Sequence, residues 1–104
     1  MQAIVSAKAR WQSDAKLRAH FRRHGAEVGA ADLASYDASA RQTIRLGKRF
    51  TYVDPATGVP RVGYYDIGRG LFTGLTDDER YITTHFRPAD GESYLRALPS
   101  STYR

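Results

Sequence analysis

The spacing of the apolar residues changes at Gly47, from a helical period before this glycine to alternation after it. Ser13 can cap a helix that begins at the next residue and ends at Gly25 or Gly29. A second helix is predicted from about residue 31 to residue 46, because apolar side chains recur there at helical spacing. Helices followed by strands are the order of an α+β domain.

Turn residues divide the second half of the chain into short strands. We expect an N-terminal helical hairpin packed on one face of a four-stranded antiparallel β-sheet meander, with the other face free to bind a ligand. The 104 residues suit one domain, residues 1–104, of which residues 1–12 are expected to be loosely ordered or the remnant of a linker. One helical turn is expected at residues 93–98. The strands are predicted at residues 48–54, 61–66, 71–75 and 80–86.

The charge balance favours a polyanionic partner. Lysine and arginine number 16 against 11 acidic residues, which gives a net charge of +5 and a pI near 9.8. Such a surface attracts nucleic acid or an acidic protein. The absence of cysteine excludes disulfides, thiolate catalysis and cysteine-based zinc sites. No segment approaches the roughly 18 apolar residues of a membrane span, so this domain is not expected to insert into a membrane.

Two of the three histidines lie four positions apart in the segment "LRAHFRRHG". On a helical wheel His20 falls at the border between the packed and solvated faces, where a general base or acid can be held and still reach a ligand. His24 falls inside the apolar stripe, which leaves open whether it packs against the sheet or contacts RNA. The third histidine, His85, lies in the last predicted strand.

Alternation in this last strand sends Thr83 and His85 to one side and Ile82 and Thr84 to the other. If the Ile82 side faces the core, Thr83 and His85 lie on the open face. A one-residue bulge would exchange the two threonines, so both stay candidates for the site.

Several strand residues are candidates for contact with RNA. Arg49 and Arg61 alternate with residues that should be buried, so both are expected on the open face, and Arg87 follows the last strand. A guanidinium binds a phosphate through two hydrogen bonds and stabilises the negative charge that develops on it. Tyr65 is a candidate for stacking on an unpaired base, although most of the seven tyrosines should build the core.

The sequence lacks the motifs of several other reaction classes. "HFRRH" is not HExxH, and the arginines between its histidines would repel a metal cation. There is no GxSxG nucleophile elbow and no glycine-rich phosphate loop. We therefore expect no metal and no cofactor. RNA cleavage through its own 2'-hydroxyl requires only histidines, a cation and a hydroxyl.

The segments "HFRRHGAEVG", "YDASARQTI" and "ITTHFRP" occur in this order over roughly residues 17–88. This order resembles the small nuclease toxin domains of the barnase, EndoU, colicin and RelE-like superfamily, found at the C-termini of bacterial polymorphic and contact-dependent inhibition toxins and in phage-borne proteins. In domains that look like this one, the motifs are HFxKHG, here with Arg23 in place of the lysine, and IxTxFxP, which favours Thr84 over Thr83. The resemblance implies helices packed on a four-stranded antiparallel sheet, and RNA cleavage without metal.

The sequence therefore predicts a metal-independent endoribonuclease toxin, with tRNA as its first candidate substrate. His20 and His85 would be general base and acid, in an order that stays open. The domain would be monomeric, secreted within a larger effector, active in the target-cell cytoplasm and neutralised by an acidic immunity protein. The alternatives are a ribosome-dependent mRNA interferase and a non-catalytic RNA-binding or phage-associated module. The predicted catalytic residues are His20, His85, Thr84 and Arg61, and the predicted RNA-binding residues are His24, Arg49, Arg87, Tyr65 and Thr83.

Overall fold

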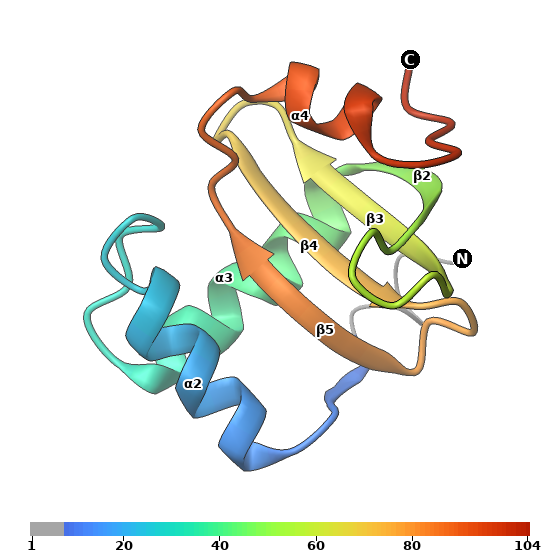
Figure 1. The fold of residues 1–104 in the computed structure, drawn as a ribbon. Coiled ribbons are helices and arrows are strands. Elements are labelled where there is room, and N and C mark those ends of the chain that lie inside the picture. Colours follow the sequence, from blue (N-terminus) through green and yellow to red (C-terminus); the bar gives the residue numbers. More distant parts are fainter. Residues whose placement is uncertain (1–7) are drawn as a thin grey trace.

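The computed structural model describes residues 8–104, which form an α+β fold with helices on a mixed sheet (Figure 1). Helices form where the apolar residues have helical spacing, and strands form where they alternate, as the sequence predicts. Within the described residues the elements are β1 (Arg10–Trp11), α2 (Asp14–His24), α3 (Leu33–Leu46), β2 (Lys48–Val53), β3 (Pro60–Asp66), β4 (Leu71–Thr76), β5 (Tyr81–Phe86) and α4 (Glu92–Ala97).

The sheet contains the predicted meander and one strand more. Its order is β1-β5-β4-β3-β2, with antiparallel neighbours throughout β2 to β5 and a parallel pairing of β1 with β5. The expectation of a purely antiparallel four-stranded sheet is therefore wrong, because β1 adds a fifth strand that is parallel to its neighbour. The expected looseness of residues 1–12 is wrong for Ala9 and Trp11, which are both buried in the core. The Trp11 ring packs on Tyr36 there. Residues 1–7 lie outside the described residues.

The two long helices both have side-chain caps, of which the sequence predicted the one at Ser13, and they pack differently from each other. Ser13 Oγ accepts a hydrogen bond from Lys16 N at the start of α2, and Asp32 caps α3 through Ser35 N. Helix α3 lies across one face of the sheet, behind it in Figure 1, and buries its apolar side chains there. Helix α2 buries no residue fully and packs against α3 and the β1–β5 edge instead. Helix α2 therefore lies beside the opposite face of the sheet, where its side chains line one side of a groove.

Part of that opposite face is covered by the C-terminal segment, so the expectation of a free face is wrong at this end of the sheet. Leu95 and Leu98 from α4 and the following turn pack with Tyr103 on aromatic side chains of β2, β3 and β4. The tail is fastened to β2, because Thr102 N donates to Thr51 O at 2.9 Å. The groove is left between α4, the β2–β3 turn and α2.

A β-bulge in β5 decides which residues face this groove. Ile82 pairs with Leu75 and Thr84 with Gly74, so Thr83 is the extra residue on its strand. The bulge places both Thr83 and Thr84 on the open side and returns the next residue to the α3 side. Gly74 is required opposite the bulge, because a Cβ there would lie 2.8 Å from the Tyr52 hydroxyl.

Candidate active site

A groove of about 550 Å³ lies between α2, β5, the β2–β3 turn and α4. Side chains from both halves of the sequence meet in it, because α2 forms one wall and the sheet forms the floor. The polar residues that line it are Gln12, Lys16, His20, Arg23, His24, Tyr52, Asp54, Thr57, Arg61, Thr83, Thr84 and Tyr94.

His20 lies at the centre of this arrangement. Its Nδ1 is 3.4 Å from Thr84 Oγ1, and its ring packs against Trp11 with 5.7 Å between centroids. Burial lowers the pKa of His20 below the usual 6.5, and the nearby His24, Arg23 and Lys16 lower it further. A lowered pKa favours the neutral imidazole, which is the form that a general base requires.

His24 is the second imidazole of the groove. Its ring centroid lies 6.0 Å from that of His20 and 5.3 Å from that of Phe86. Its Nδ1 lies 3.3 Å from the Glu27 Oε2 atom, one helical turn further along the chain. The sequence placed His24 within the packed stripe, and the structure brings it into the groove as well.

Arg61 is the cation on the sheet side of the groove. Its Nη2 lies 3.5 Å from Asp54 Oδ2, and only 16% of its side chain is exposed. Its Nε is buried and has no hydrogen-bond partner within residues 8–104. A buried donor without a partner is costly, and a phosphate oxygen in the groove would supply an acceptor.

His85 does not face the groove, so its predicted place on the open face is wrong. The bulge at Thr83 turns it towards α3, where its exposed fraction is 0%. Its Nε2 lies 2.9 Å from Ser39 Oγ, and its Nδ1 lies 2.9 Å from Thr73 Oγ1 and 3.1 Å from Phe72 O. Burial, opposed in part by the bond to Phe72 O, lowers its pKa to about 4.

The hydrogen bonds around His85 are complete for a neutral ring. The Thr73 hydroxyl donates to Ala40 O at 3.1 Å, so it accepts from Nδ1–H of His85. Arg69 Nη2 donates to Ser39 Oγ at 2.8 Å, which leaves the serine proton for Nε2 of His85. A histidine bonded in this way holds the core together.

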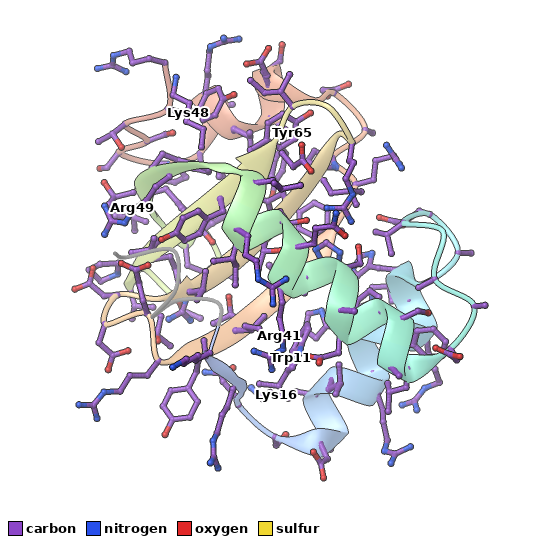
Figure 2. The ribbon with its side chains drawn as sticks, turned by 180° about the vertical axis from the view of Figure 1, so that it is seen from behind. Trp11, Lys16, Arg41, Lys48, Arg49 and Tyr65 are labelled. Atoms are coloured by element: carbon purple, nitrogen blue, oxygen red, sulfur yellow. The ribbon has the colours of Figure 1, made fainter. Side chains whose placement is uncertain are left out.

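Arg49 lies on the α3 side of the sheet and not on the groove face, where the sequence placed it with Arg61. Arg49 pairs with Tyr64 across the strands, and cross-strand partners share a face. Its Nη2 lies 3.0 Å from Glu79 Oε2. Figure 2, viewed from the α3 side, shows Arg49 well apart from Lys16, a residue of the groove.

Arg87 and Tyr65 also lie outside the groove lining. Arg87 Nε donates to Glu27 O at 2.9 Å and its Nη1 to Arg69 O at 2.8 Å, because the loop between α2 and α3 reaches the end of β5. Tyr65 is only 6% exposed, because Tyr103 of the C-terminal segment covers it. The cover over Tyr65 contradicts its predicted contact with RNA, whereas Arg87 is exposed outside the groove and its contact with RNA stays a prediction.

The groove contains residues that the sequence reasoning missed. Lys16 and Arg23 stand four residues before and three residues after His20, so helical spacing alone could have placed them beside it. No local sequence pattern indicates the other three, Asp54, Tyr52 and Tyr94. The β2–β3 turn, the pairing of β2 with β3 and helix α4 place them in the groove.

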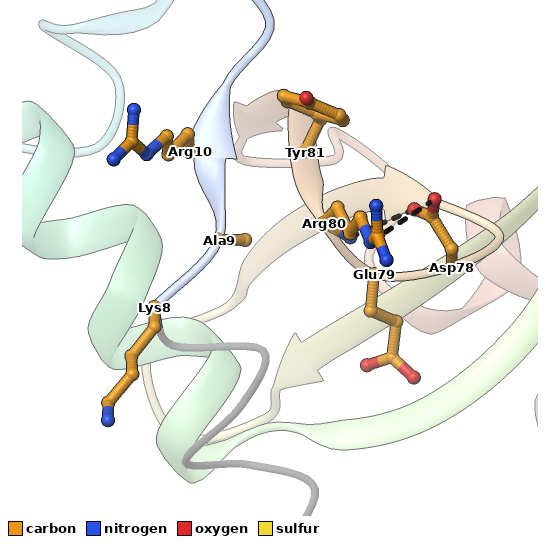
Figure 3. A pocket seen from close by; sticks show the side chains of 7 residues that line it. All are labelled: Lys8, Ala9, Arg10, Asp78, Glu79, Arg80 and Tyr81. Carbon is orange, nitrogen blue, oxygen red and sulfur yellow. Dashed lines mark hydrogen bonds and ion pairs between the residues drawn. The ribbon is translucent and has the colours of Figure 1, made fainter.

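A second hollow, of about 360 Å³, lies at the other end of the β1–β5 edge (Figure 3). Its charges are of both signs, and Arg80 Nε lies 4.0 Å from Asp78 Oδ2. No histidine of the described residues lines it, and two of its seven lining residues, Asp78 and Glu79, are acidic. The first groove is therefore the better candidate for a site that binds a polyanion.

Within residues 8–104 no cluster of three or more histidine and acidic side chains is arranged to hold a metal ion, and no helix there has the length and apolar character of a membrane span. No family model, curated protein or solved structure matches this chain. The function is therefore argued from the groove itself.

Proposed function

We propose that this domain is a metal-independent endoribonuclease that cleaves RNA by attack of the RNA's own 2'-hydroxyl. The observation that carries the proposal is the approach of His20 Nδ1 to Thr84 Oγ1, 3.4 Å apart, in a groove that is lined by basic side chains. An imidazole, a hydroxyl and cations are the groups that this reaction needs.

In the proposed reaction His20 removes the proton from the 2'-hydroxyl, and the oxygen attacks the adjacent phosphorus. The bond from phosphorus to the 5'-oxygen breaks, and His24 donates a proton to that leaving oxygen. His24 takes the role that the sequence reasoning gave to His85, because it lines the groove and His85 is buried behind the sheet. The products are a 2',3'-cyclic phosphate and a 5'-hydroxyl.

The charges and rings of the groove support this assignment. Arg61 would stabilise the extra negative charge on the phosphorane, and Lys16 and Arg23 on α2 would bind the flanking phosphates. Thr84 would hold the His20 ring in place for proton transfer. Tyr94 lines the same groove and offers a surface for an unpaired base.

The biological setting in this proposal is that of a secreted toxin whose RNA target, tRNA first, is in another cell. A basic groove of this kind would be blocked most simply by an acidic immunity protein that covers it. The net charge of +5 favours such a partner as well as RNA.

The test is incubation of the wild-type domain with total RNA in EDTA, followed by mapping of the fragment ends. We expect discrete fragments with 2',3'-cyclic phosphate ends, and no cleavage of an oligonucleotide with a 2'-deoxy residue at the mapped site. RNA bound but uncut would favour the non-catalytic module. Cleavage only with translating ribosomes present would favour the mRNA interferase.

A further inference from the structure

The loop between α2 and α3 is fastened to the end of β5 by Arg87 and Glu27. Arg87 N donates to Glu27 Oε2 at 3.0 Å, and Arg87 Nε donates to Glu27 O at 2.9 Å. A third bond, from Arg87 Nη1 to Arg69 O at 2.8 Å, fixes the guanidinium itself. The Glu27 carboxylate is therefore held in one place although 38% of it is exposed.

The same carboxylate oxygen faces the groove histidine. Glu27 Oε2 lies 3.3 Å from His24 Nδ1, which is an ion-pair distance, and this buried nitrogen has no hydrogen bond within residues 8–104. Within residues 8–104 this carboxylate is the charged group that pairs with the ring. A chain of contacts therefore runs from the Arg87 backbone N–H to the Glu27 carboxylate and from there to the His24 imidazole, which lines the groove.

We propose that Glu27 is a positioning residue of the active site, which keeps a proton on His24 Nδ1 so that Nε2 exchanges its proton with the substrate. This inference rests on the proposed ribonuclease function. A carboxylate on one ring nitrogen fixes the orientation of the imidazole and compensates the positive charge that the ring carries during proton transfer. Arg87 acts one step further away, by holding the loop and with it the carboxylate.

The decisive variant is Glu27→Gln, which keeps the size of the side chain and an oxygen for Arg87 N but removes the charge. We expect kcat on an oligoribonucleotide to fall by about 10- to 100-fold, with KM changed by less than about 2-fold. The matched control is Glu92→Gln, which removes a carboxylate that bonds the Tyr103 hydroxyl outside the groove. The control should leave kcat unchanged.

A spectroscopic readout separates orientation from general damage. In ¹⁵N-histidine spectra at high pH, we expect the His24 proton on Nδ1 in the wild type and a shift towards Nε2 in Glu27→Gln. Arg87→Ala loosens the loop but keeps the carboxylate and a backbone N–H at position 87. It should lower the melting temperature more than Glu27→Gln and kcat less.

The outcomes distinguish this inference from the proposed function. A wild type that cleaves no RNA would overturn both. An active wild type with Glu27→Gln equally active, or with the His24 tautomer unchanged, would overturn the role of Glu27 and leave the ribonuclease standing. An equal loss of kcat in Arg87→Ala and Glu27→Gln would also overturn it, because loop position and not charge would then explain the effect.

Discussion

One histidine–threonine pair lies on each face of the sheet, and the two pairs differ in burial and in hydrogen bonding. On the groove side His20 Nδ1 lies 3.4 Å from Thr84 Oγ1, and both residues are partly exposed. On the α3 side His85 Nδ1 lies 2.9 Å from Thr73 Oγ1, and both are buried. The first pair lines a groove that can admit a ligand, whereas helix α3 covers the second pair.

Hydrogen bonding separates the two faces further. Both nitrogens of His85 have partners, so this ring has no bond left to offer. In the groove Arg61 Nε is buried without a hydrogen-bond partner within residues 8–104. His24 Nδ1 there has the 3.3 Å ion-pair contact with Glu27 Oε2 and no hydrogen bond in the described part of the chain. The comparison teaches that a satisfied polar cluster builds the fold, whereas an incomplete one marks the place where a substrate can complete it.

The largest expected effect is on the groove pair. His20→Ala should lower kcat/KM for RNA cleavage by about 1000-fold, because the general base is lost. The melting temperature should fall little, since His20 belongs to a helix that buries no residue fully. Steady-state kinetics and circular dichroism on the same preparation check both parts.

The second-largest expected effect is the pH dependence of the free energy of unfolding, which arises from His85 on the α3 side of the sheet. The unfolded chain takes up a proton on His85 near pH 6.5, whereas the folded chain, with its pKa lowered to about 4, does not. Stability is therefore full above pH 6.5 and should fall by about 3 kcal/mol as the pH drops from 6.5 to 4. Urea unfolding across this range measures it.

The variant His85→Gln isolates this contribution, because the lowered pKa of His20 acts in the same direction in both proteins. Glutamine should make the protein less stable at pH 7.5 and its stability less dependent on pH. If wild type and variant lost stability in parallel between pH 6.5 and 4, the neutral, buried state of His85 would be contradicted.

Third in size is the contrast between two arginines of the sheet. Arg61→Gln should lower kcat/KM by about 100-fold, because the charge that faces the phosphate in the groove is lost. Arg49→Gln, on the α3 side beside Glu79, should lower it less than about 2-fold. The same kinetic assay measures both, and equal losses would remove the reason for placing the site in the groove.

The smallest effect separates the two threonines. Thr84→Val should reduce kcat about 10-fold with stability almost unchanged, because the hydroxyl that positions His20 is lost. Thr73→Val should instead destabilise the fold by about 2 kcal/mol, since it leaves His85 Nδ1 and Ala40 O with fewer partners. Kinetics and urea unfolding of both variants would show a crossed pattern, and a loss of kcat in Thr73→Val alone would contradict it.

Local signals in the sequence predicted the helices and the meander. The cap at Ser13, the stop at Gly47 and the change of period are properties of neighbouring residues, and the structure confirms each of them. The border position of His20 on its helix could be read in the same way, and the structure places it beside Thr84.

The errors arose where distant parts of the chain meet. Strict alternation put His85 on the open face, but the bulge at Thr83 shifts every later residue of the strand to the other face. Tyr65 was expected to be open because no local pattern shows that Tyr103 folds back over it. Arg49 was expected beside Arg61 because the register between β2 and β3, which puts them on opposite faces, is not written in either strand alone.

The central claim is that the groove residues catalyse the reaction and that His85 stabilises the fold. The most direct measurement is single-turnover cleavage of one oligoribonucleotide in EDTA at pH 7.5 by wild type, His20→Ala and His85→Gln, each corrected for its folded fraction. We predict cleavage by wild type and by folded His85→Gln at comparable rates, and almost none by His20→Ala. A fully active His20→Ala beside a folded but inactive His85→Gln would contradict the account.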